Sequence, residues 1–267
     1  MKKSSLCMVN ENVRIAENTY RMLICAPETA QSVKPGQFVH IKIPYDRSLL
    51  LRRPISISNV FTDSGGIIEI IYRVAGTGTY LLSQIKSTDF IDVLGPLGNG
   101  FTKPKFVKRA FVVGGGCGIA PLKLLIKNWD DVRFSSFLGF KSKQYAYDLD
   151  QFELLSEYVF VSTDDGSLGH LGVVTDLLSL RLKREVPDLM LACGPMSMLK
   201  ETKHLAAKHG IPCQISLEER MGCGIGGCLV CVCETQKGTS FEYKKVCSDG
   251  PVFWSDEVLM NFDESKC

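Results

Sequence analysis

Residues 109–128, RAFVVGGGCGIAPLKLLIKN, decide the fold of this chain. They start as a run of apolar residues typical of a buried strand, continue through a glycine-rich turn, and pass into a helical repeat of apolar residues. The same order recurs downstream, where strand-like segments at 133–140, 158–163 and 189–193 are each followed by a helical stretch. Alternating strands and helices indicate a parallel sheet with right-handed crossovers. We therefore predict a parallel-sheet domain over residues 104–215.

The sequence before this stretch has a different period. Val39 and Ile41 alternate with His40 and Lys42, as in a strand that buries one face. Similar alternating segments follow between turn signals about every ten residues, which is the spacing of short antiparallel strands. We predict a small antiparallel β-barrel over residues 1–103.

The last part of the chain, residues 216–267, differs in composition. It holds five of the 11 cysteines between Cys223 and Cys247, and its nine acidic and five basic residues give it a net charge of −4. No signal-peptide core begins the chain, so clustered cysteines indicate metal or redox chemistry rather than a disulfide scaffold. The segment is too short to form a core alone, and we predict a small metal-binding subdomain.

Four of these cysteines have the spacing Cys223-x4-Cys228-x2-Cys231-x15-Cys247. This spacing is typical of plant-type [2Fe–2S] proteins, in which four thiolates hold two irons. The neighbouring glycines suit a loop that turns sharply and points N–H groups at sulfur. A tetrahedral zinc site, which more often shows paired x2 spacings, and free buried thiols remain as alternatives. Cys233 points to the opposite face from Cys231 on an extended segment, and we assign it to packing.

A second motif, Arg53-Pro54-Ile55-Ser56, lies on a predicted barrel strand and is followed by IYRVAGTGT at 71–79. A Gly-Thr-Gly-Thr turn that opens a short helix offers N–H groups to an anion. An arginine side chain can bind a pyrophosphate in a bidentate manner. Together these features predict a dinucleotide on the barrel, whereas an Arg and a Ser on a strand would by themselves suit a solvated face.

The glycine-rich turn at 114–121 lies between a strand and a helix, where parallel-sheet domains bind phosphates. Ile119 breaks the strict G-x-G-x-x-G pattern, so a purely structural turn is the alternative. Asp164 and Asp165 follow a predicted strand, and carboxylates there accept hydrogen bonds from ribose and repel a 2′-phosphate, which favours NAD over NADP. Two lysines after the preceding strand favour the opposite choice.

The overall composition excludes several classes of protein. With 31 basic and 29 acidic residues among 267, the formal charge is +2, which gives no electrostatic reason to expect nucleic acid as a partner. No apolar run is long enough for a transmembrane helix or a signal-peptide core, and we expect a cytoplasmic protein that does not bind membranes. The four histidines, His40, His170, His204 and His209, form no pair at ligand spacing, and we expect them on the surface. We find no set of catalytic acid, base or nucleophile residues, and a protein that only transfers electrons needs none.

The chain resembles the ferredoxin-reductase-type flavoproteins in a series of segments that occur in order: RRPIS, IYRVAGTGT, GPLGNGF, GGGCGIAPL, DDGSLG, CGPMSM, EERMGCGIGGCLVCVC and KKVCSDGPVF. Within this family the similarity is closest to the electron transfer subunits of type B dihydroorotate dehydrogenases. The resemblance implies a multidomain β plus α/β fold. It would comprise an N-terminal FAD-binding β-barrel over 1–103, a central NAD-binding α/β domain over 104–215 and a C-terminal [2Fe–2S] subdomain over 216–267.

The resemblance also implies which residues hold the cofactors. FAD would be contacted by residues of two barrel strands and the turn after them: Arg53, Pro54, Ile55, Ser56, Ile71, Tyr72, Arg73, Gly78 and Thr79. The cluster would be ligated by Cys223, Cys228, Cys231 and Cys247. Ile55 occupies the position of an aromatic residue in the wider family, so an apolar side chain would replace ring stacking on the flavin.

By this resemblance the chain is expected to relay electrons in pyrimidine (UMP) biosynthesis. Its partner would be an FMN-containing dihydroorotate dehydrogenase catalytic subunit, and two copies of each chain would assemble. Electrons would pass from the FMN through [2Fe–2S] and FAD to NAD+, a diffusible acceptor. Two alternatives remain: an iron–sulfur flavoprotein subunit of another NAD(P)H-linked reductase, of ferredoxin:NADP or sulfide-linked type, and a non-enzymatic scaffold that binds zinc.

Overall fold

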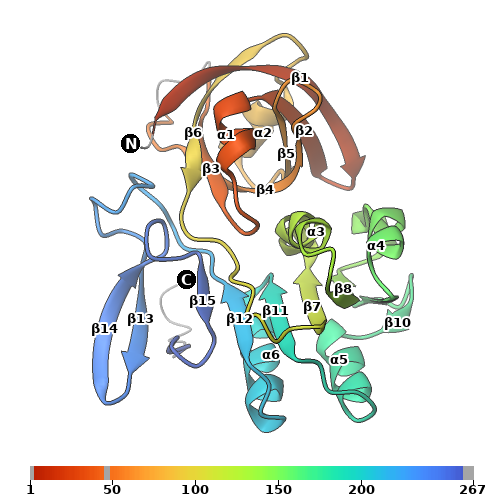
Figure 1. The fold of residues 1–267 in the computed structure, drawn as a ribbon. Coiled ribbons are helices and arrows are strands. Elements are labelled where there is room, and N and C mark those ends of the chain that lie inside the picture. Colours follow the sequence, from red (N-terminus) through yellow and green to blue (C-terminus); the bar gives the residue numbers. More distant parts are fainter. Residues whose placement is uncertain (1–2, 45–48, 261–267) are drawn as a thin grey trace.

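The computed structural model of the chain describes residues 3–44 and 49–260. Its first part is a closed barrel, at the top of Figure 1, with the strand order β1-β2-β5-β4-β3-β6 and antiparallel pairing throughout. The antiparallel barrel predicted from the sequence is therefore confirmed. Its strands are β1 (Ser4–Ala16), β2 (Thr19–Cys25), β3 (Phe38–Lys42), β4 (Arg53–Phe61), β5 (Ile67–Arg73) and β6 (Phe90–Leu97).

Two short helices accompany the barrel. Helix α2 (Thr77–Ser83) begins in the Gly-Thr-Gly-Thr turn, as the sequence predicts. Helix α1 (Pro27–Ser32) was not predicted, because its six residues begin with a proline and carry no apolar period. The barrel interior holds the inward-facing side chains of the strands, Val39 and Ile41 among them.

The second part is a sheet with the strand order β10-β9-β8-β7-β11-β12-β15. All pairs from β10 to β12 are parallel. The order reverses between β7 and β11, and ligands of such sheets bind outside the carboxyl ends of the strands at this reversal. The strands are β7 (Arg109–Gly115), β8 (Arg133–Phe140), β9 (Tyr158–Thr163), β10 (His170–Leu171), β11 (Leu189–Cys193), β12 (Cys213–Ser216) and β15 (Val252–Trp254).

Helices cover both faces of this sheet and bury alternate residues of each strand. Ala110 and Val112 pack with α3 and α4 on one face, whereas Phe111 and Val113 pack with α5 and α6 on the other. None of the helices in the described residues is long and apolar enough to cross a membrane. The helices are α3 (Ile119–Asn128), α4 (Leu149–Leu155), α5 (Val174–Leu182) and α6 (Met196–Lys208), with short 3-10 turns η1 (Gly116–Gly118) and η2 (Lys143–Tyr145).

The residues after β12 form a loop, the hairpin of β13 (Val232–Lys237) and β14 (Ser240–Lys245), and then β15. Strand β15 pairs with β12 in antiparallel fashion, so the end of the chain returns to the sheet. Cys231 and Cys247 pack in the same core as α5 and α6, together with Phe38 of the barrel. The C-terminal segment therefore shares its core with the rest of the molecule, in keeping with its short length.

A buried ionic cluster joins the barrel to the sheet. Lys123 of α3 lies 2.6 Å from a carboxylate oxygen of Glu69 on β5 and also pairs with Asp148. Arg21 on β2 pairs with the same two carboxylates. Two cations and two anions thus balance where helix α3 lies against the barrel (Figure 1).

Candidate cofactor sites

The four motif cysteines lie together in the loop before β13 and the turn after β14. Their contacts form two pairs, because the Cys223 N–H donates to Cys228 Sγ at 3.3 Å and the Cys247 N–H donates to Cys231 Sγ at 3.4 Å. The Gly226 N–H joins the pairs by donating to Cys247 Sγ at 3.2 Å. Two sulfur pairs suit a cluster of two irons, each of which takes two thiolates.

Further backbone N–H groups point at the first sulfur. Cys223 Sγ accepts from Ile225 N at 3.4 Å and from Gly227 N at 3.2 Å. Although burial opposes it, these N–H groups and Cys228 lower the pKa of the Cys223 thiol to about 6. Donors aimed at sulfur stabilise thiolates and the sulfurs of a cluster, so the loop fits a [2Fe–2S] group.

Among residues 3–44 and 49–260, no three His, Cys, Asp or Glu side chains converge as ligands of one ion. Cys233, the fifth cysteine of the segment, packs against the core under α5 and α6, and burial raises the pKa of its thiol to about 11. Its position agrees with the packing role expected from the sequence.

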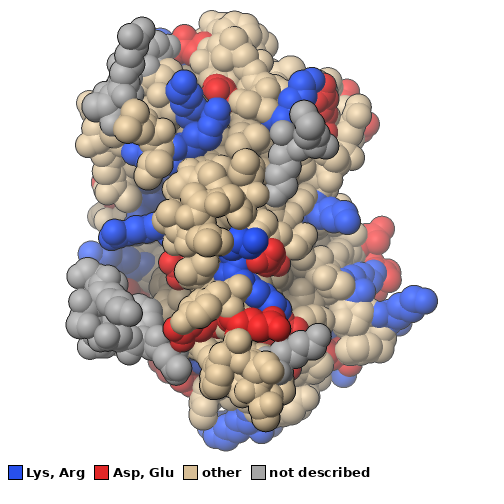
Figure 2. Space-filling model, turned by 90° about the vertical axis from the view of Figure 1, so that its left-hand side faces the viewer, with Lys and Arg blue, Asp and Glu red and all other residues tan. Residues whose placement is uncertain are grey.

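The loop between β12 and β13, residues 217–231, is called the cluster loop below, and its rim is apolar and open to solvent. Ile225, Leu229 and Val230 are each more than half exposed, and Cys228 is exposed between them in the chain, whereas Cys231 and Cys247 are buried. Figure 2 shows the face of the molecule that carries the loop and the hairpin, where uncharged side chains gather at mid-height between basic side chains and a row of acidic ones. The cluster site thus lies at the surface, with two ligands inside and one outside.

The expected surface position of His40 is wrong. Its side chain does point out of the barrel, yet it is 0% exposed because the cluster loop covers it. A Cβ on Gly224 would lie 2.4 Å from His40 Nδ1, and Gly224 has φ +72°, so only glycine allows this close approach. Burial lowers the pKa of His40. The covering loop comes from the far end of the chain, which no local pattern reveals.

The flavin segment predicted on β4 faces the turn that opens α2. A Cβ on Gly78 would lie 2.5 Å from Arg53 Nε, so the guanidinium lies directly against this glycine. Thr79 Oγ1 accepts hydrogen bonds from the N–H groups of Ala75 at 2.9 Å and Gly76 at 3.3 Å, and so shapes the turn. Arg53 donates to the Leu51 carbonyl, and no salt bridge to it is seen among the described residues, so a cation held against a glycine is available for a pyrophosphate.

The remaining predicted flavin residues divide between the two faces of their strands. Ile55 is 8% exposed and packs inside the barrel, while Ser56 is half-buried and Pro54 is exposed. Tyr72 also points into the barrel, where its hydroxyl donates to Asn12 Oδ1 at 2.9 Å. Side-chain contacts already engage Tyr72, so its backbone is the part left for a ligand.

Ile71 and Arg73 point away from the barrel interior. Ile71 packs in the core on the α3 face of the sheet, whereas Arg73 is exposed at the end of β5. Arg73 therefore faces the space between the barrel and the carboxyl edge of the sheet. This is the side on which a ligand could contact both parts of the chain.

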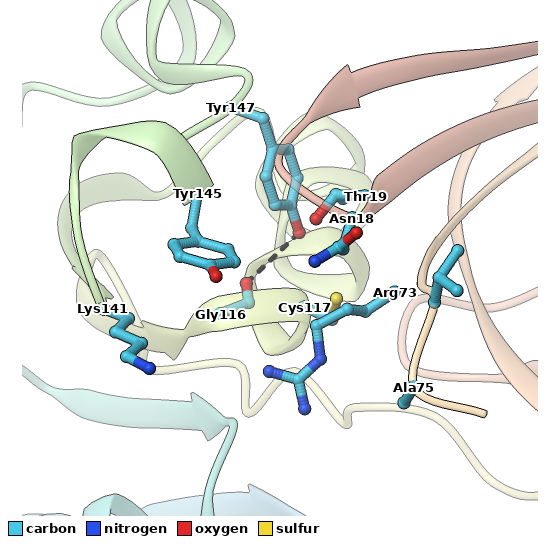
Figure 3. Close-up of a pocket in the computed structure, with 10 residues that line it drawn as sticks. Asn18, Thr19, Arg73, Ala75, Gly116, Cys117, Lys141, Tyr145 and Tyr147 are labelled. Carbon is cyan, nitrogen blue, oxygen red and sulfur yellow. Dashed lines mark hydrogen bonds between the residues drawn. The ribbon is translucent and has the colours of Figure 1, made fainter.

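A cavity of about 370 Å³ occupies that space. Figure 3 shows the guanidinium of Arg73, the sulfur of Cys117 and the amine of Lys141 facing it, with Tyr147 donating a hydrogen bond to the Gly116 carbonyl at 3.2 Å. The glycine-rich turn lines the cavity at the point of strand-order reversal. Its location is that of a nucleotide site in sheets of this order.

The turn also has a structural role. A Cβ on Gly118 would lie 2.3 Å from the carbonyl oxygen of Cys193, so the turn and the end of β11 touch through their backbones. Cys193 is 2% exposed and Cys117 is half-buried. The alternative of a structural turn and the prediction of a phosphate turn are thus compatible.

The acidic residues after β9 lie beside a lysine-bearing turn. Asp165 accepts hydrogen bonds from the Ser167 N–H at 3.0 Å and its hydroxyl at 2.6 Å, and Ser167 Oγ accepts from the Lys143 N–H at 2.7 Å. The Ser167 hydroxyl is the main reason why the pKa of Asp165 is lowered. Asp164 and Asp165 are both exposed, which leaves carboxylate oxygens accessible at the strand end.

The sequence reasoning missed Tyr147, which lines the cavity, and Glu218, which interacts electrostatically with the cavity residue Arg73. Glu218 directly follows the β12–Leu217 segment, and desolvation raises its pKa while Arg73 opposes the rise. Tyr147 is buried and fixes the glycine-rich turn. The one signal in the sequence for Glu218 was its place just beyond the carboxyl end of a parallel strand.

Two family models match parts of the chain. The model described as "Oxidoreductase FAD-binding domain" matches residues 6–101. The model described as "Iron-sulfur cluster binding domain of dihydroorotate dehydrogenase B" matches residues 218–259. Each match covers the segment in which the sequence analysis predicts the same cofactor.

Similar solved structures share the fold. A structure of the NADH-dependent reduced ferredoxin-NADP oxidoreductase, studied for flavin-based electron bifurcation, has a TM-score of 0.84 at 33% identity, over 99% of this chain and 92% of that one. The ferredoxin reductase in carbazole 1,9a-dioxygenase has a TM-score of 0.67 at 18% identity, over 79% and 67% of the two chains, and shows similarity of fold alone.

Three curated relatives match almost the whole chain, and each is named as the electron transfer subunit of dihydroorotate dehydrogenase B (NAD(+)). The Fusobacterium nucleatum protein is 42% identical over 94% of this chain and 97% of its own length. The Geobacillus thermodenitrificans protein is 44% identical over 92% and 95%, and the Enterococcus faecalis protein is 42% identical over 97% and 99%. This chain therefore belongs to the family of dihydroorotate dehydrogenase B electron transfer subunits.

Proposed function

We propose that the chain passes electrons between an FMN-containing dihydroorotate dehydrogenase catalytic subunit and NAD+, in the cytoplasm and in the service of pyrimidine synthesis. FAD exchanges a hydride with nicotinamide and single electrons with a [2Fe–2S] cluster, and so links a two-electron carrier to a one-electron carrier. The observation that carries the proposal is that the four cysteine sulfurs form two pairs held by backbone N–H donors. They lie beside a barrel in which Arg53 packs against Gly78 and can bind a pyrophosphate.

We assign one task to each part of the chain. Residues 1–103 would bind FAD, residues 104–215 would bind NAD(H), and residues 216–267 would hold the cluster. The shared core and the pairing of β15 with β12 support close contact among the three, which electron transfer needs.

The flavin residues would act in three ways. Arg53 would bind the pyrophosphate against Gly78, with Thr79 holding the turn in shape. Pro54 and Ser56 would line the flavin on β4, whereas Ile55 would contribute only its backbone, because its side chain packs inside the barrel and does not replace an aromatic ring on the flavin. The end of β5 would contribute the backbone of Tyr72, and Ile71 and Arg73 would lie toward the nicotinamide side.

The cavity beside Arg73 would admit NAD(H). Lys141 and Cys117 line it, and the exposed carboxylates of Asp164 and Asp165 at the same sheet edge favour NAD over NADP by repelling a 2′-phosphate. No residue in this group needs to abstract a proton from a substrate. The chain would bind and orient nicotinamide and exclude water from it.

The partner would cover the exposed apolar rim of the cluster loop. Ile225, Leu229 and Val230 are close to Cys228 in the sequence, and Cys228 is the exposed cysteine of the four, so an electron from another chain would enter beside it. Two copies of each chain would form the complex. Neither a membrane nor a nucleic acid would take part.

The test is the anaerobically purified chain, with iron, sulfide and flavin counted per chain and a visible spectrum recorded. We expect one FAD, two irons and two sulfides, and dihydroorotate-dependent reduction of NAD+ only after the catalytic subunit is added. Zinc without colour would refute the proposal. Oxidation of dihydroorotate at full rate by the chain alone would refute the division of labour.

A second candidate has a specific observation in its favour. The similarity to the reduced ferredoxin-NADP oxidoreductase structure covers 99% of this chain, so a ferredoxin-linked partner suits the same fold. The exposed carboxylates after β9 favour the NAD-linked function, because they would repel the 2′-phosphate of NADP. Reduction of a ferredoxin by NADPH, with no response to the dihydroorotate-oxidising subunit, would favour this second candidate instead.

A further inference from the structure

His40 lies between the two predicted cofactor segments. On β3 it is paired with Pro54 of the flavin segment on β4, and its ring is covered by Gly224, the residue after the first cluster ligand. The imidazole is 0% exposed, and among residues 3–44 and 49–260 neither ring nitrogen has a hydrogen-bond partner of ordinary geometry. It is therefore a polar group sealed beneath the cluster loop without the partners that burial normally demands.

Such a residue costs stability. Unsatisfied polar groups in a water-free place are unfavourable, and an apolar side chain of similar size would fill the same space without that cost. Local rules are broken in this way chiefly where function requires it. The use of His40 should therefore be sought in the cofactors on either side of it.

A continuous set of contacts runs through His40. Asp92 binds Arg52 through both carboxylate oxygens, at 3.0 and 2.7 Å, and Arg52 Nη1 donates to the His40 carbonyl at 3.3 Å. The ring faces the backbone of Arg52 and of Cys223, which interact with its nitrogens although the geometry is not that of an ordinary hydrogen bond. The imidazole thus lies between Arg52, next to the flavin residue Arg53, and Cys223, the first cluster ligand.

We propose that His40 is a positioning residue for electron transfer between the flavin and the cluster. Its ring fixes the Cys223–Gly224 segment against β3 and β4, and so sets the position of the first ligand relative to the flavin segment. Residues just outside the ligands of a metal site commonly set its properties in this manner. The inference rests on the proposed function, because it needs both cofactors to be bound.

The experiment compares holoproteins of His40→Leu, His40→Gln and, as control, His204→Leu on the exposed side of α6. Three quantities are measured after anaerobic mixing with NADH: the rate of flavin reduction, the rate of cluster bleaching, and the EPR spectrum of the reduced cluster. Melting temperature and iron content are recorded for each variant.

For His40→Leu we expect unchanged iron, unchanged flavin reduction and a melting temperature at or above that of the native chain. Cluster bleaching should slow by about 10–100-fold, the usual effect of removing an outer partner of a metal site, with an altered EPR spectrum. His40→Gln, which keeps an N–H donor and an acceptor, should restore most of the rate. The His204 variant should match the native chain.

Native bleaching rate and EPR spectrum in His40→Leu would overturn the inference. If His40→Leu loses its cluster, His40→Met is tested in its place, because the methionine side chain is more adaptable and fills the same space. The bleaching rate and the EPR spectrum of His40→Met are then interpreted as for His40→Leu. Loss of the cluster in both apolar variants would also overturn it, because His40 would then serve folding alone. Absence of flavin or cluster from the native chain would instead refute the proposed function.

Discussion

Replacing Lys123 by Met should destabilise the whole molecule, because it unbalances the buried ionic cluster between barrel and sheet. The side chains of Lys123, Glu69 and Asp148 are only 5%, 6% and 4% exposed. Without the lysine, Arg21 is the one cation among the described residues that remains paired with the two buried carboxylates. Breaking a buried pair by removing one partner costs about 3–5 kcal/mol, because the other charge stays buried.

For a chain of this size that loss corresponds to a fall in melting temperature of roughly 6–20 °C. Scanning calorimetry of the holoprotein measures it. The matched control is Lys3→Met, because Lys3 and Glu28 are 69% and 74% exposed at 3.5 Å and an exposed pair contributes at most about 1 kcal/mol.

The double variant Lys123→Met with Glu69→Gln provides the decisive comparison. It removes one cation and one anion and leaves Asp148 paired with Arg21, so the charges balance again. It should therefore be more stable than the sum of the single losses predicts, by about 0.5–3 kcal/mol. Strict additivity, or a Lys123→Met variant as stable as the control, would refute the reasoning.

Three further predictions concern the cluster loop and the sheet. Cys228→Ser should abolish the cluster spectrum and transfer to the partner while FAD binding survives in a flavin count; joint loss of FAD would mean that the two sites form one cooperative unit. Gly224→Ala should prevent cluster incorporation because its Cβ would lie 2.4 Å from His40, whereas Gly238→Ala, with φ +62° but open space around it, should retain normal iron content and serves as control. Asp188 accepts the N–H groups of Lys108, just before β7, and of Arg109, its first residue, both at 2.9 Å, which holds the pKa of Asp188 below the ordinary value of about 3.9. The ionised Asp188 carboxylate therefore stabilises the fold at pH values above its ordinary pKa, and this stabilisation disappears as the pH falls through the lower pKa of the folded state. In an acid titration the melting temperature of Asp188→Asn should fall less steeply than that of the native chain. An identical acid profile of the two proteins would contradict this prediction.

Local pattern predicted those parts of the fold whose signal is local. Strands β8, β9 and β11 were found because strands of a covered parallel sheet are continuous apolar runs. The cluster ligands were proposed because three of the four lie within nine residues, 223–231, and their spacing carries the chemistry. Their roles and those of the flavin residues stay predictions.

What the sequence did not reveal depends on contacts between distant segments. His40 alternates like an outward, solvated residue, and only the cluster loop from the far end of the chain buries it. Strand β15 has three residues and no period of its own, so its place beside β12 follows from the sheet edge rather than from its sequence. Tyr147 lines the cavity and Glu218 interacts electrostatically with Arg73, which also lines it; both relations join distant segments, which periodicity alone does not give.

Strand β15 also protects the molecule against aggregation. An open sheet exposes unpaired backbone groups at its edges, and these can recruit strands from other molecules. In this chain β15 covers β12 at one end of the sheet, and the other end is closed by β10, which is only two residues long. A fragment cut before the cysteine-rich segment would leave β12 bare, so the sheet depends on that segment for its own solubility.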